Sequence, residues 1–589
     1  MHQPKQFYTQ QLEHYLSLAK KSSAQLTLLG WMRLAVFLIT AIVIYLTIAN
    51  WQLAAIIGLV GIGIFLYLLI RYNNKKSELQ LQEALVDINS EELLMADRTF
   101  HHRYAGEDFL DPKHPYSLDI DLFGRGSFFQ YINRTAINEG TALLASLLCE
   151  NNLKDIPERQ EAIQELSRHQ EWQQHYAAVA GIIKVETSAK TIISWLTSYQ
   201  SAIPKWMPWA SIIMSVISLL LLGLSIAELI TIELFGYWLF VGLAITGLYL
   251  KKVNVLAHQT DKIKDTFRQY ANLLEQIEQK NFESQLLKSQ QKRIESKDIR
   301  ASAIFSRFSK HLDALDNRNN LISAIFGNGY FLVDLKNAVK VERWIETYGH
   351  KVLDWFEVVT FFDAYNSLGV FAFNHPSHSF PNISSSKTAI KAMALGHPLL
   401  DPGKRVDSDI HINNQEFFII TGANMAGKST FLRSVSLHIV MANVGLPVCA
   451  TSSTYSPIKL ITSMRTTDSL TDDSSYFFSE LTRLKFIVDQ IEDEPYFIIL
   501  DEILKGTNST DKAIGSRKFV EKLVEGSATG IIATHDLSLC AIADQLQDVK
   551  NYYFDAEIVN DELFFDYTLK KGICQNMNAS FLLKKMEII

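Results

Sequence analysis

The stretch Thr421–Thr430 constrains the fold of this chain more than any other part of the sequence. It reads T-G-A-N-M-A-G-K-S-T and matches the pattern G-x-x-x-x-G-K-[ST], in which glycines let the backbone bend around phosphate groups. The apolar run Phe417–Ile420 before it is typical of a buried strand, and Phe431–Val440 after it is typical of a helix. A chance glycine-rich turn seldom carries the full pattern in this context. The sequence therefore predicts a phosphate-binding loop (P-loop) in a C-terminal α/β domain.

The residues of this loop indicate ATP as the ligand and Mg²⁺ as its cofactor. Backbone N–H groups and the helix N-terminus would surround the phosphates. Lys428 is predicted to contact the β- and γ-phosphates as a catalytic residue, and the hydroxyl of Ser429 is predicted to ligate Mg²⁺. The predicted nucleotide-binding residues are Gly422, Ala423, Asn424, Met425, Ala426, Gly427, Lys428, Ser429 and Thr430.

Two later apolar strands end in polar residues that suit ATP hydrolysis. Tyr496–Leu500 is followed by Asp501 and Glu502. Asp501 is expected to hold Mg²⁺, directly or through water, and Glu502 to polarise the attacking water as a general base. Another strand begins at Gly530 and leads to His535, which would lie beside the γ-phosphate as a sensor. Together with the P-loop, these residues predict an ATPase.

Two pairs of apolar runs lie outside this domain. Leu34–Ala49 and Leu53–Ile70 are joined by three residues, and Trp209–Ala227 and Leu234–Leu250 by a short acidic connection. Each run is near the lower limit of the roughly 17–25 residues that cross a bilayer. A buried soluble hairpin is the alternative, but the runs are apolar all round and lack a polar stripe. We therefore expect two transmembrane helical hairpins, with the lipid bilayer as a partner.

Positive residues flank both hairpins on the same side. By the positive-inside rule, residues 1–30, 73–208 and 251–589 lie in the cytosol. We expect a multi-pass protein of the cell membrane with four spanning helices and a cytoplasmic ATPase domain. The flanking residues are Lys20, Lys21, Arg33, Arg71, Lys75, Lys76, Lys205, Lys251 and Lys252.

The remaining sequence is mostly helical in pattern. Residues 77–208 have ordinary amphipathic spacing, and residues 253–345 are long, polar and helix-prone. The net charge of −7 leaves no overall basic footprint for nucleic acid. A basic stretch at 288–310 could contact phosphate or lipid head groups, but its interspersed acids favour a solvated helix face.

Several of these motifs resemble those of the MutS family of DNA mismatch-repair ATPases. The P-loop is similar to that family's T-G-P-N-M-G-G-K-S-T, including its Asn-Met pair. Asp501–Asp511 is similar to its D-E-I-G-R-G-T-S-T-Y-D, and Ala533–His535 matches its A-T-H. Gly396–Pro398 resembles the start of its ATPase domain, and residues 118–163 resemble the start of its core domain. The resemblance covers roughly residues 110–589, interrupted by the second hairpin.

The resemblance implies a dimer and a mechanism. MutS-like ATPases cover each nucleotide with a signature segment of the other subunit, and Ser475 lies at the corresponding place. It therefore implies a homodimer through the ATPase domains, with Ser475 as a nucleotide contact. It also implies that ATP binding and hydrolysis move long lever helices.

The departures from the family concern DNA. The first hundred residues contain no Phe-x-Glu mismatch reader, and the second hairpin stands where the family has its DNA clamp. Ala423 and Ala426 replace the usual Pro and Gly, and Ser475 lacks the usual Gly-Arg before it. DNA is left open as a partner, because no residue identifies a mismatch-binding site.

The predicted fold is mixed, with a mostly helical core and lever region, two transmembrane hairpins and a C-terminal α/β P-loop domain. One hypothesis is a membrane-anchored MutS-like ATPase that drives lever motion and is linked to DNA mismatch repair. The alternative is a mechanochemical ATPase that acts on the membrane or a membrane partner without DNA. An ABC-type transporter is disfavoured because the sequence has no L-S-G-G-Q motif. The expected domains are an N-terminal segment (1–30), hairpin (31–72), core (73–208), hairpin (209–250), lever and core (251–390) and ATPase domain (391–589).

Overall fold

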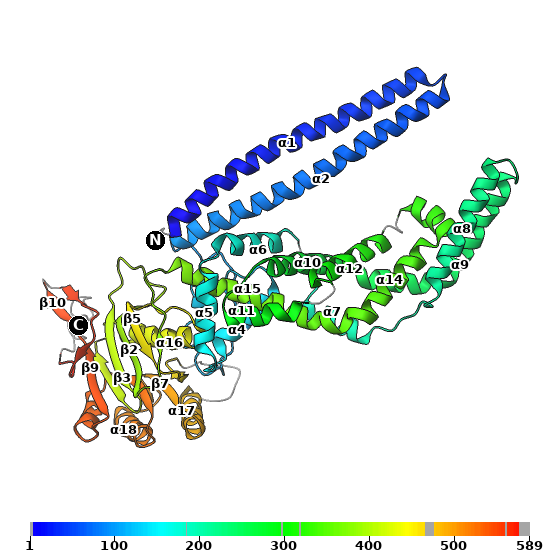
Figure 1. The fold of residues 1–589 in the computed structure, drawn as a ribbon. Coiled ribbons are helices and arrows are strands. Elements are labelled where there is room, and N and C mark those ends of the chain that lie inside the picture. Colours follow the sequence, from blue (N-terminus) through cyan, green and yellow to red (C-terminus); the bar gives the residue numbers. More distant parts are fainter. Residues whose placement is uncertain are drawn as a thin grey trace.

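The fold is mixed, with a largely helical N-terminal part and a C-terminal α/β domain. Figure 1 shows a long N-terminal hairpin, an elongated helical body, a second hairpin at the far end of that body and the α/β domain at the opposite end. The predicted fold class is confirmed at this level. The computed structural model describes residues 4–183, 185, 187–295, 299–316, 320–423, 425–465, 476–559 and 562–575.

Hairpin 1 consists of α1 (Pro4–Thr47) and α2 (Trp51–Ala96). The predicted polar N-terminal segment and the first apolar run form one continuous helix of 44 residues, and α2 continues for 46 residues in the same way. Helices of this length extend well beyond the ~20 residues that cross a bilayer. Asn50 Oδ1 accepts a hydrogen bond from Leu53 N at the start of α2 (3.2 Å). The apolar runs therefore form only the distal half of a longer hairpin.

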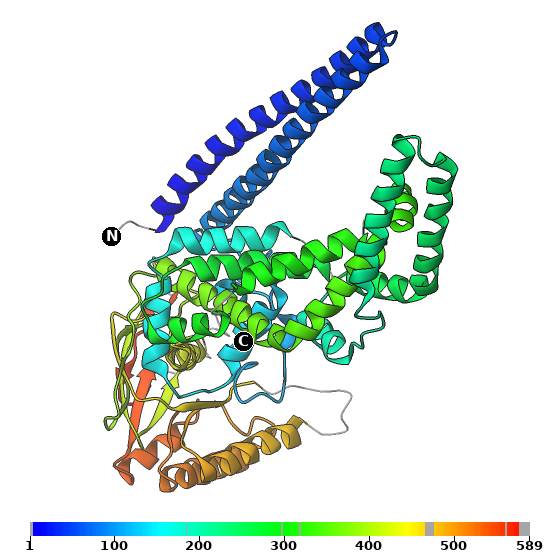
Figure 2. The same ribbon diagram turned by 45° about the vertical axis from the view of Figure 1, so that its right-hand side comes forward.

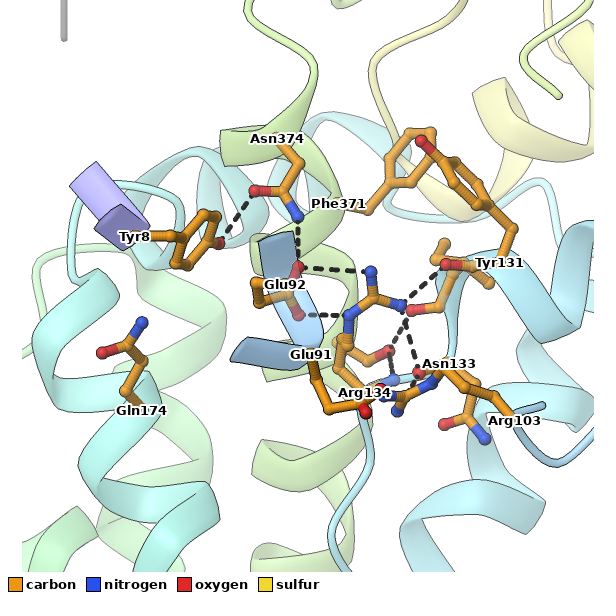
Figure 3. A network of polar contacts seen from close by, with 12 residues as sticks. Tyr8, Glu91, Glu92, Arg103, Tyr131, Asn133, Arg134, Gln174, Phe371 and Asn374 are labelled. Carbon is orange, nitrogen blue, oxygen red and sulfur yellow. Dashed lines mark hydrogen bonds and ion pairs between the residues drawn. The ribbon is translucent and has the colours of Figure 1, made fainter. Parts of the chain in front are cut away.

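A buried polar network joins hairpin 1 to the helical body (Figure 3). Tyr8 Oη donates to Asn374 Oδ1 (2.8 Å), and Asn374 Nδ2 donates to Glu92 Oε2 (2.9 Å). The guanidinium of Arg134 forms an ion pair with Glu92, and these two side chains are only 11% and 6% exposed. Nearby, the side-chain amides of Gln174 and of Asn89 on α2 donate hydrogen bonds to each other. The network brings both helices of the hairpin, the 128–134 segment and the end of the last helix of the body together.

The helical body consists of short helices that pack around aromatic side chains. A cluster of edge-to-face and stacked rings fills its centre, including Phe267, Phe305, Phe308 and Trp344. Among its described residues, the polar region after residue 261 is divided into short helices, the longest of which has 23 residues. The elements are η1 (Glu107–Phe109), α3 (Phe128–Ile132), α4 (Asn138–Cys149), α5 (Ile156–Leu166), α6 (Gln170–Ile182), α7 (Ala189–Ser198), α10 (Lys264–Gln279), α11 (Gln285–Ile294), α12 (Ala301–Asp316), η3 (Ser323–Gly327), α13 (Asn328–Phe331), α14 (Val333–Tyr348), η4 (Gly349–Lys351) and α15 (Val352–Asn374).

Hairpin 2 consists of α8 (Met207–Ile226) and α9 (Ile232–Asp261). In both views of the molecule, its tip and that of hairpin 1 lie on the side away from the α/β domain (Figures 1 and 2). Within the described residues, α1, α2, α8 and α9 are the four helices that are long and apolar enough to cross a membrane. The predicted topology, with both tips on one side, is compatible with this arrangement.

The α/β domain is built on a six-stranded sheet with the order β12-β9-β4-β8-β7-β6, parallel except for β12. A smaller sheet has the order β1-β5-β2-β3, and β10 and β11 form a hairpin. One apolar core is continuous from the helical body to α16 and one face of the main sheet, and a second fills the other face. The elements are β1 (Asn382–Ile383), β2 (Thr388–Leu395), β3 (Ser408–Asn413), β4 (Phe417–Gly422), α16 (Lys428–Val444), β5 (Ser452–Tyr455), β6 (Lys459–Ser463), α17 (Tyr476–Asp493), β7 (Tyr496–Asp501), α18 (Ser509–Glu525), β8 (Thr529–Ala533), η5 (Leu537–Asp544), β9 (Val549–Phe554), β10 (Glu557–Val559), β11 (Glu562–Phe564) and β12 (Lys570–Lys571).

The register of the central strands brings the predicted motifs to one edge of the sheet. β8 lies between β4 and β7, with Ala533 opposite both Ile420 and Asp501. Parallel strands end at the same edge, which is where open α/β sheets bind ligands. The P-loop, the acidic pair after β7 and the histidine after β8 therefore meet there.

Candidate nucleotide-binding site

Two glycines give the P-loop its shape. Gly422 and Gly427 have φ angles of 154° and 101°, which L-residues with side chains rarely adopt. A Cβ atom on Gly422 would lie 2.7 Å from the carbonyl oxygen of Phe554, and one on Gly427 would lie 3.1 Å from the ring of Tyr567. α16 begins directly after Gly427, so its N-terminal N–H groups face the loop. The predicted strand, loop and helix are all present.

Lys428 is buried at the base of the loop. Its Nζ donates to the carbonyl oxygens of Gly422 (2.9 Å) and Ala423 (3.0 Å). Burial lowers the pKa of Lys428, while the nearby carboxylates of Asp501 and Glu502 act in the opposite direction. The ammonium is thus held inside the loop, where a point charge can contact phosphate oxygens.

Ser429 and Asp501 form the candidate magnesium site. Ser429 Oγ donates to Asp501 Oδ2 at 2.6 Å, which links the first turn of α16 to the end of β7. A hydroxyl and a carboxylate oxygen are hard ligands of the kind that Mg²⁺ prefers beside substrate phosphates. The two residues predicted as metal ligands therefore fit this ion, and the structure brings them together.

Glu502 and His535 form a close pair beside the magnesium site. Glu502 Oε1 lies 2.7 Å from His535 Nε2, and this contact is the main cause that lowers the pKa of Glu502 to about 2. His535 Nε2 is also 3.3 Å from Lys428 Nζ. Nε2 of His535 cannot donate to Glu502 and accept from Lys428 at once. Because the contact to Glu502 is shorter, we place a proton on Nε2, which donates it in a hydrogen bond to the Glu502 carboxylate. Glu502 is held ionised, as a general base must be.

A pocket of about 350 Å³ adjoins the loop. Its lining is mixed: apolar and aromatic side chains lie together with hydroxyl groups, one histidine and the basic side chains of Lys404 and Arg405. The sequence motifs do not predict this pocket, because its wall comes from three distant segments that carry no shared pattern. Six of its lining residues are Leu400, Arg405, Val406, Met425, Phe431 and Tyr567.

Two neighbouring residues of α5 connect the helical body with the α/β domain. Arg159 of α5 donates to the carbonyl oxygen of Asn443 (2.8 Å), at the C-terminal end of α16. Its neighbour Gln160 donates to the carbonyl oxygen of Pro381 (3.0 Å). Both residues belong to the 118–163 segment, which resembles the start of that family's core domain. Arg159 attaches the helix that begins at Lys428 to the helical body, and Gln160 attaches the chain just before β1.

Two acidic residues of the same segment were missed as functional candidates. Asp119 accepts hydrogen bonds from Thr462 Oγ1 (2.6 Å) and from Arg465 N (2.8 Å). Asp121 forms ion pairs with Arg433 (3.0 Å) and Arg465 (2.6 Å). The L-D-I-D alternation was visible in the sequence, but the partner residues lie more than 300 positions away.

The other predicted site residues have different outcomes. Ser475 and Asn424 lie outside the described residues. Within the basic stretch, Arg293 forms ion pairs with Asp354 (3.2 Å) and Glu357 (2.5 Å) of α15, which agrees with a structural role for that side chain. The P-loop positions that the structure describes are Gly422, Ala423, Met425, Ala426, Gly427, Lys428, Ser429 and Thr430.

Comparison with known proteins supports the resemblance for the C-terminal region. Residues 418–585 match the family model described as MutS domain V. The chain is 32% identical over 194 residues to "MutS protein homolog 4" of Homo sapiens, covering 31% of this chain and 20% of that protein. It is 29% identical over 214 residues to "DNA mismatch repair protein MutS 2" of Halobacterium salinarum, covering 36% of this chain and 25% of that protein. The similarity thus spans about a fifth to a quarter of the length of these relatives.

Proposed function

We propose that this protein is a membrane-anchored ATPase of the MutS type, in which ATP binding and hydrolysis in the α/β domain move the helical body and the two hairpins. The observation that carries the proposal is the convergence of Lys428, the Ser429–Asp501 pair and the Glu502–His535 pair at one sheet edge. Among the described residues, four helices are long and apolar enough to cross a membrane.

In this proposal, each residue of the site has one task in ATP hydrolysis. Lys428 and the N–H groups of the loop bind the β- and γ-phosphates. Mg²⁺, bound through Ser429 and Asp501, would neutralise phosphate charge. Glu502 accepts the proton of the attacking water, and His535 orients the carboxylate of Glu502. The aromatic and aliphatic part of the pocket beside Tyr567 suits the adenine ring, because such side chains pack on its faces.

The connection from this site to the hairpins runs through a few hydrogen bonds. α16 begins at the predicted phosphate site, and its C-terminal end is hydrogen-bonded to Arg159 of α5. A shift of α16 would therefore be transmitted to α5. Arg98, which follows α2, donates to the carbonyl oxygen of Pro398 in the α/β domain (3.2 Å). Tyr131 Oη contacts His375 Nε2 (2.9 Å) at the C-terminal end of α15, from which the chain continues to the α/β domain. Hairpin 1 is therefore placed where it can respond to nucleotide.

The proposal includes a homodimer through the α/β domains. In the resembling family, the signature segment of one subunit covers the nucleotide of the other, and Ser475 is the corresponding residue here. Asp119 and Asp121 hold the chain at Arg465, just before that segment. A dimer would join two pairs of hairpins and let one ATP site control both.

A link to DNA mismatch repair is the second candidate function, favoured by the names of the relatives. It is tested by binding of matched and mismatched duplexes at physiological salt, with and without ATP. A mismatch preference of tenfold or more, about 1.4 kcal/mol, would support that role. Salt-dependent binding without preference would indicate phosphate contacts alone. No binding would favour a mechanochemical ATPase that acts on the membrane or a membrane partner.

Two variants test the ATPase proposal in detergent-purified protein. Lys428→Ala should abolish tight nucleotide binding, because the phosphates lose their point charge. Glu502→Gln should bind ATP as the parent chain does but lower turnover by a factor on the order of 10²–10⁴, since only proton acceptance is lost. Equal loss of ATP binding in both variants would contradict the role given to Glu502.

A further inference from the structure

A short apolar segment between α12 and α14 packs against hairpin 2. It comprises the described residues 320–332, with η3 and α13 as its helical turns. Residues 320–333 contain no Asp, Glu, Lys or Arg. The sequence did not predict a membrane role for this segment, because a run this short cannot cross a bilayer.

The backbone at the end of this segment is bonded to serines of α8. Ser211 Oγ donates to the carbonyl oxygen of Phe331 (2.7 Å). Ser218 Oγ lies 2.8 Å from the carbonyl oxygens of both Tyr330 and Met214, which share its one proton. Helix ends leave carbonyl groups without partners inside the helix, and in lipid each such group is costly. The serine hydroxyls of an otherwise apolar helix satisfy these groups.

The packing against α9 is equally close. A Cβ atom on Gly242 would lie 2.0 Å from the carbonyl oxygen of Gly329, so the two backbones touch. The rings of Phe235 and Tyr330 stack with centroids 4.4 Å apart. Small residues that allow such approach are typical of helix contacts inside membranes.

The other side of the segment is exposed and apolar. Leu321 and Phe326 are 73% and 52% exposed, and Ile322 is exposed as well. On α8, which the segment contacts, Leu219 and Leu220 are also exposed. Exposed apolar side chains on both elements suit lipid acyl chains.

The contacts also fix the depth of the segment. Ser218 lies 11 positions after Met207, the first residue of α8. That distance is roughly 17 Å along a helix, about half of a hydrocarbon core of ~30 Å. The first charged residue after the segment is Asp334, which accepts a hydrogen bond from Asn328 Nδ2 (2.9 Å).

We propose that residues 320–332 form a re-entrant membrane segment that enters the bilayer beside hairpin 2 and contacts lipid acyl chains through Leu321, Ile322 and Phe326. This inference rests on the proposed membrane insertion of hairpin 2. Non-spanning backbone is tolerated at such depth only where its polar groups are satisfied by protein, which the two serines and the helical turns provide.

The test uses spin labels on the full chain in lipid nanodiscs, with the native cysteines replaced and ATP turnover retained as the check of folding. Single labels are placed at Phe326, at Leu220 on α8, and at Leu353, an exposed apolar residue of α15. Collision rates with oxygen, which enters lipid, and with a water-soluble nickel complex are measured. We expect the label at Phe326 to behave like the label at Leu220. Its collision rate with the nickel complex should be several-fold lower than that of the label at Leu353.

Each other result contradicts this inference in a distinguishable way. If Leu220 is protected from nickel but Phe326 is not, the segment lies in water while hairpin 2 remains in the membrane. If Leu220 is also accessible to nickel, membrane insertion of hairpin 2 fails and this inference fails with it. If Phe326 is shielded from both reagents, protein covers the segment, as a second copy of the chain would.

Discussion

The two hairpins share one sequence signal but differ in how they are attached. Hairpin 1 is a pair of long helices whose apolar runs occupy only the distal half, and its base is held by the buried Glu92–Arg134 pair close to the α/β domain. Hairpin 2 is at the far end of the helical body and packs through glycines and serines against residues 320–332. The attachment of hairpin 1 should therefore be sensitive to charge, and that of hairpin 2 to side-chain volume.

Thiol labelling tests whether the two hairpins are equivalent in topology, and its expected effect is all or none. A cysteine at Gln52 or Thr231, in the two tips, should react with an impermeant reagent added outside intact cells. Cysteines at Ser90 and at the exposed Ser289 should react only after the membrane is opened. Labelling of Ser289 from outside would overturn the orientation.

Loss of charge pairing should affect hairpin 1 most. Glu92→Gln leaves the Arg134 guanidinium buried without its ion pair, which should destabilise the docked hairpin by about 3–5 kcal/mol. Hydrogen exchange of α2 measures the opening free energy. The double variant with Arg134→Met should recover part of the loss, because no unpaired charge remains.

The matched control is an exposed ion pair of the same hairpin. Lys5 and Asp97 are 2.7 Å apart and 60% exposed, so Lys5→Ala should cost at most about 1 kcal/mol. Equal losses for Glu92→Gln and Lys5→Ala would show that the buried network does not hold hairpin 1.

A change of volume should affect hairpin 2 instead. Gly242→Ala places a methyl group against the backbone of Gly329 and should destabilise the contact by about 1–3 kcal/mol. Gly247→Ala on the same helix meets no atom within 4 Å and serves as the control. Thermal unfolding in detergent compares the two. A larger effect of Gly247→Ala would contradict the packing described.

The smallest expected effect concerns a single hydroxyl. Ser218→Ala removes the hydroxyl that donates to Tyr330 O or Met214 O and accepts from Trp238 Nε1, and should cost about 0.5–1.5 kcal/mol. Ser215 donates only within its own helix, to Ser211, so Ser215→Ala should cost less. The same unfolding assay measures both. Identical losses of stability would contradict the role given to Ser218 in satisfying the backbone of residues 320–332.

The α/β site could be predicted from sequence because its determinants are local. Lys428 and Ser429 lie within one motif, and Asp501 and His535 each follow a buried strand, so parallel strand order is enough to bring them together. The pocket beside Tyr567 could not be predicted in this way, since its walls come from separate segments without a common pattern.

The attachment of the hairpins could not be predicted from the sequence for a related reason. Glu92 and Arg134 look like ordinary surface residues, and only the fold buries them together. Residues 320–332 lie within the stretch 253–345, which the sequence predicts only as polar and helix-prone, and their serine partners on α8 lie about 110 to 120 positions earlier. Hydropathy detects spans that cross a membrane, whereas a re-entrant segment depends on tertiary contacts.

The distance between the two hairpin tips tests the central claim most directly, namely that nucleotide in the α/β domain moves the membrane hairpins. The distance between spin labels at Gln52 and Thr231 is measured in Glu502→Gln protein in nanodiscs. The labelled protein is diluted with unlabelled chain so that only distances within one chain contribute. The account predicts that ATP shifts the distance distribution and that the shift disappears in Lys428→Ala. Unchanged distributions, in protein shown to have bound ATP, would contradict it.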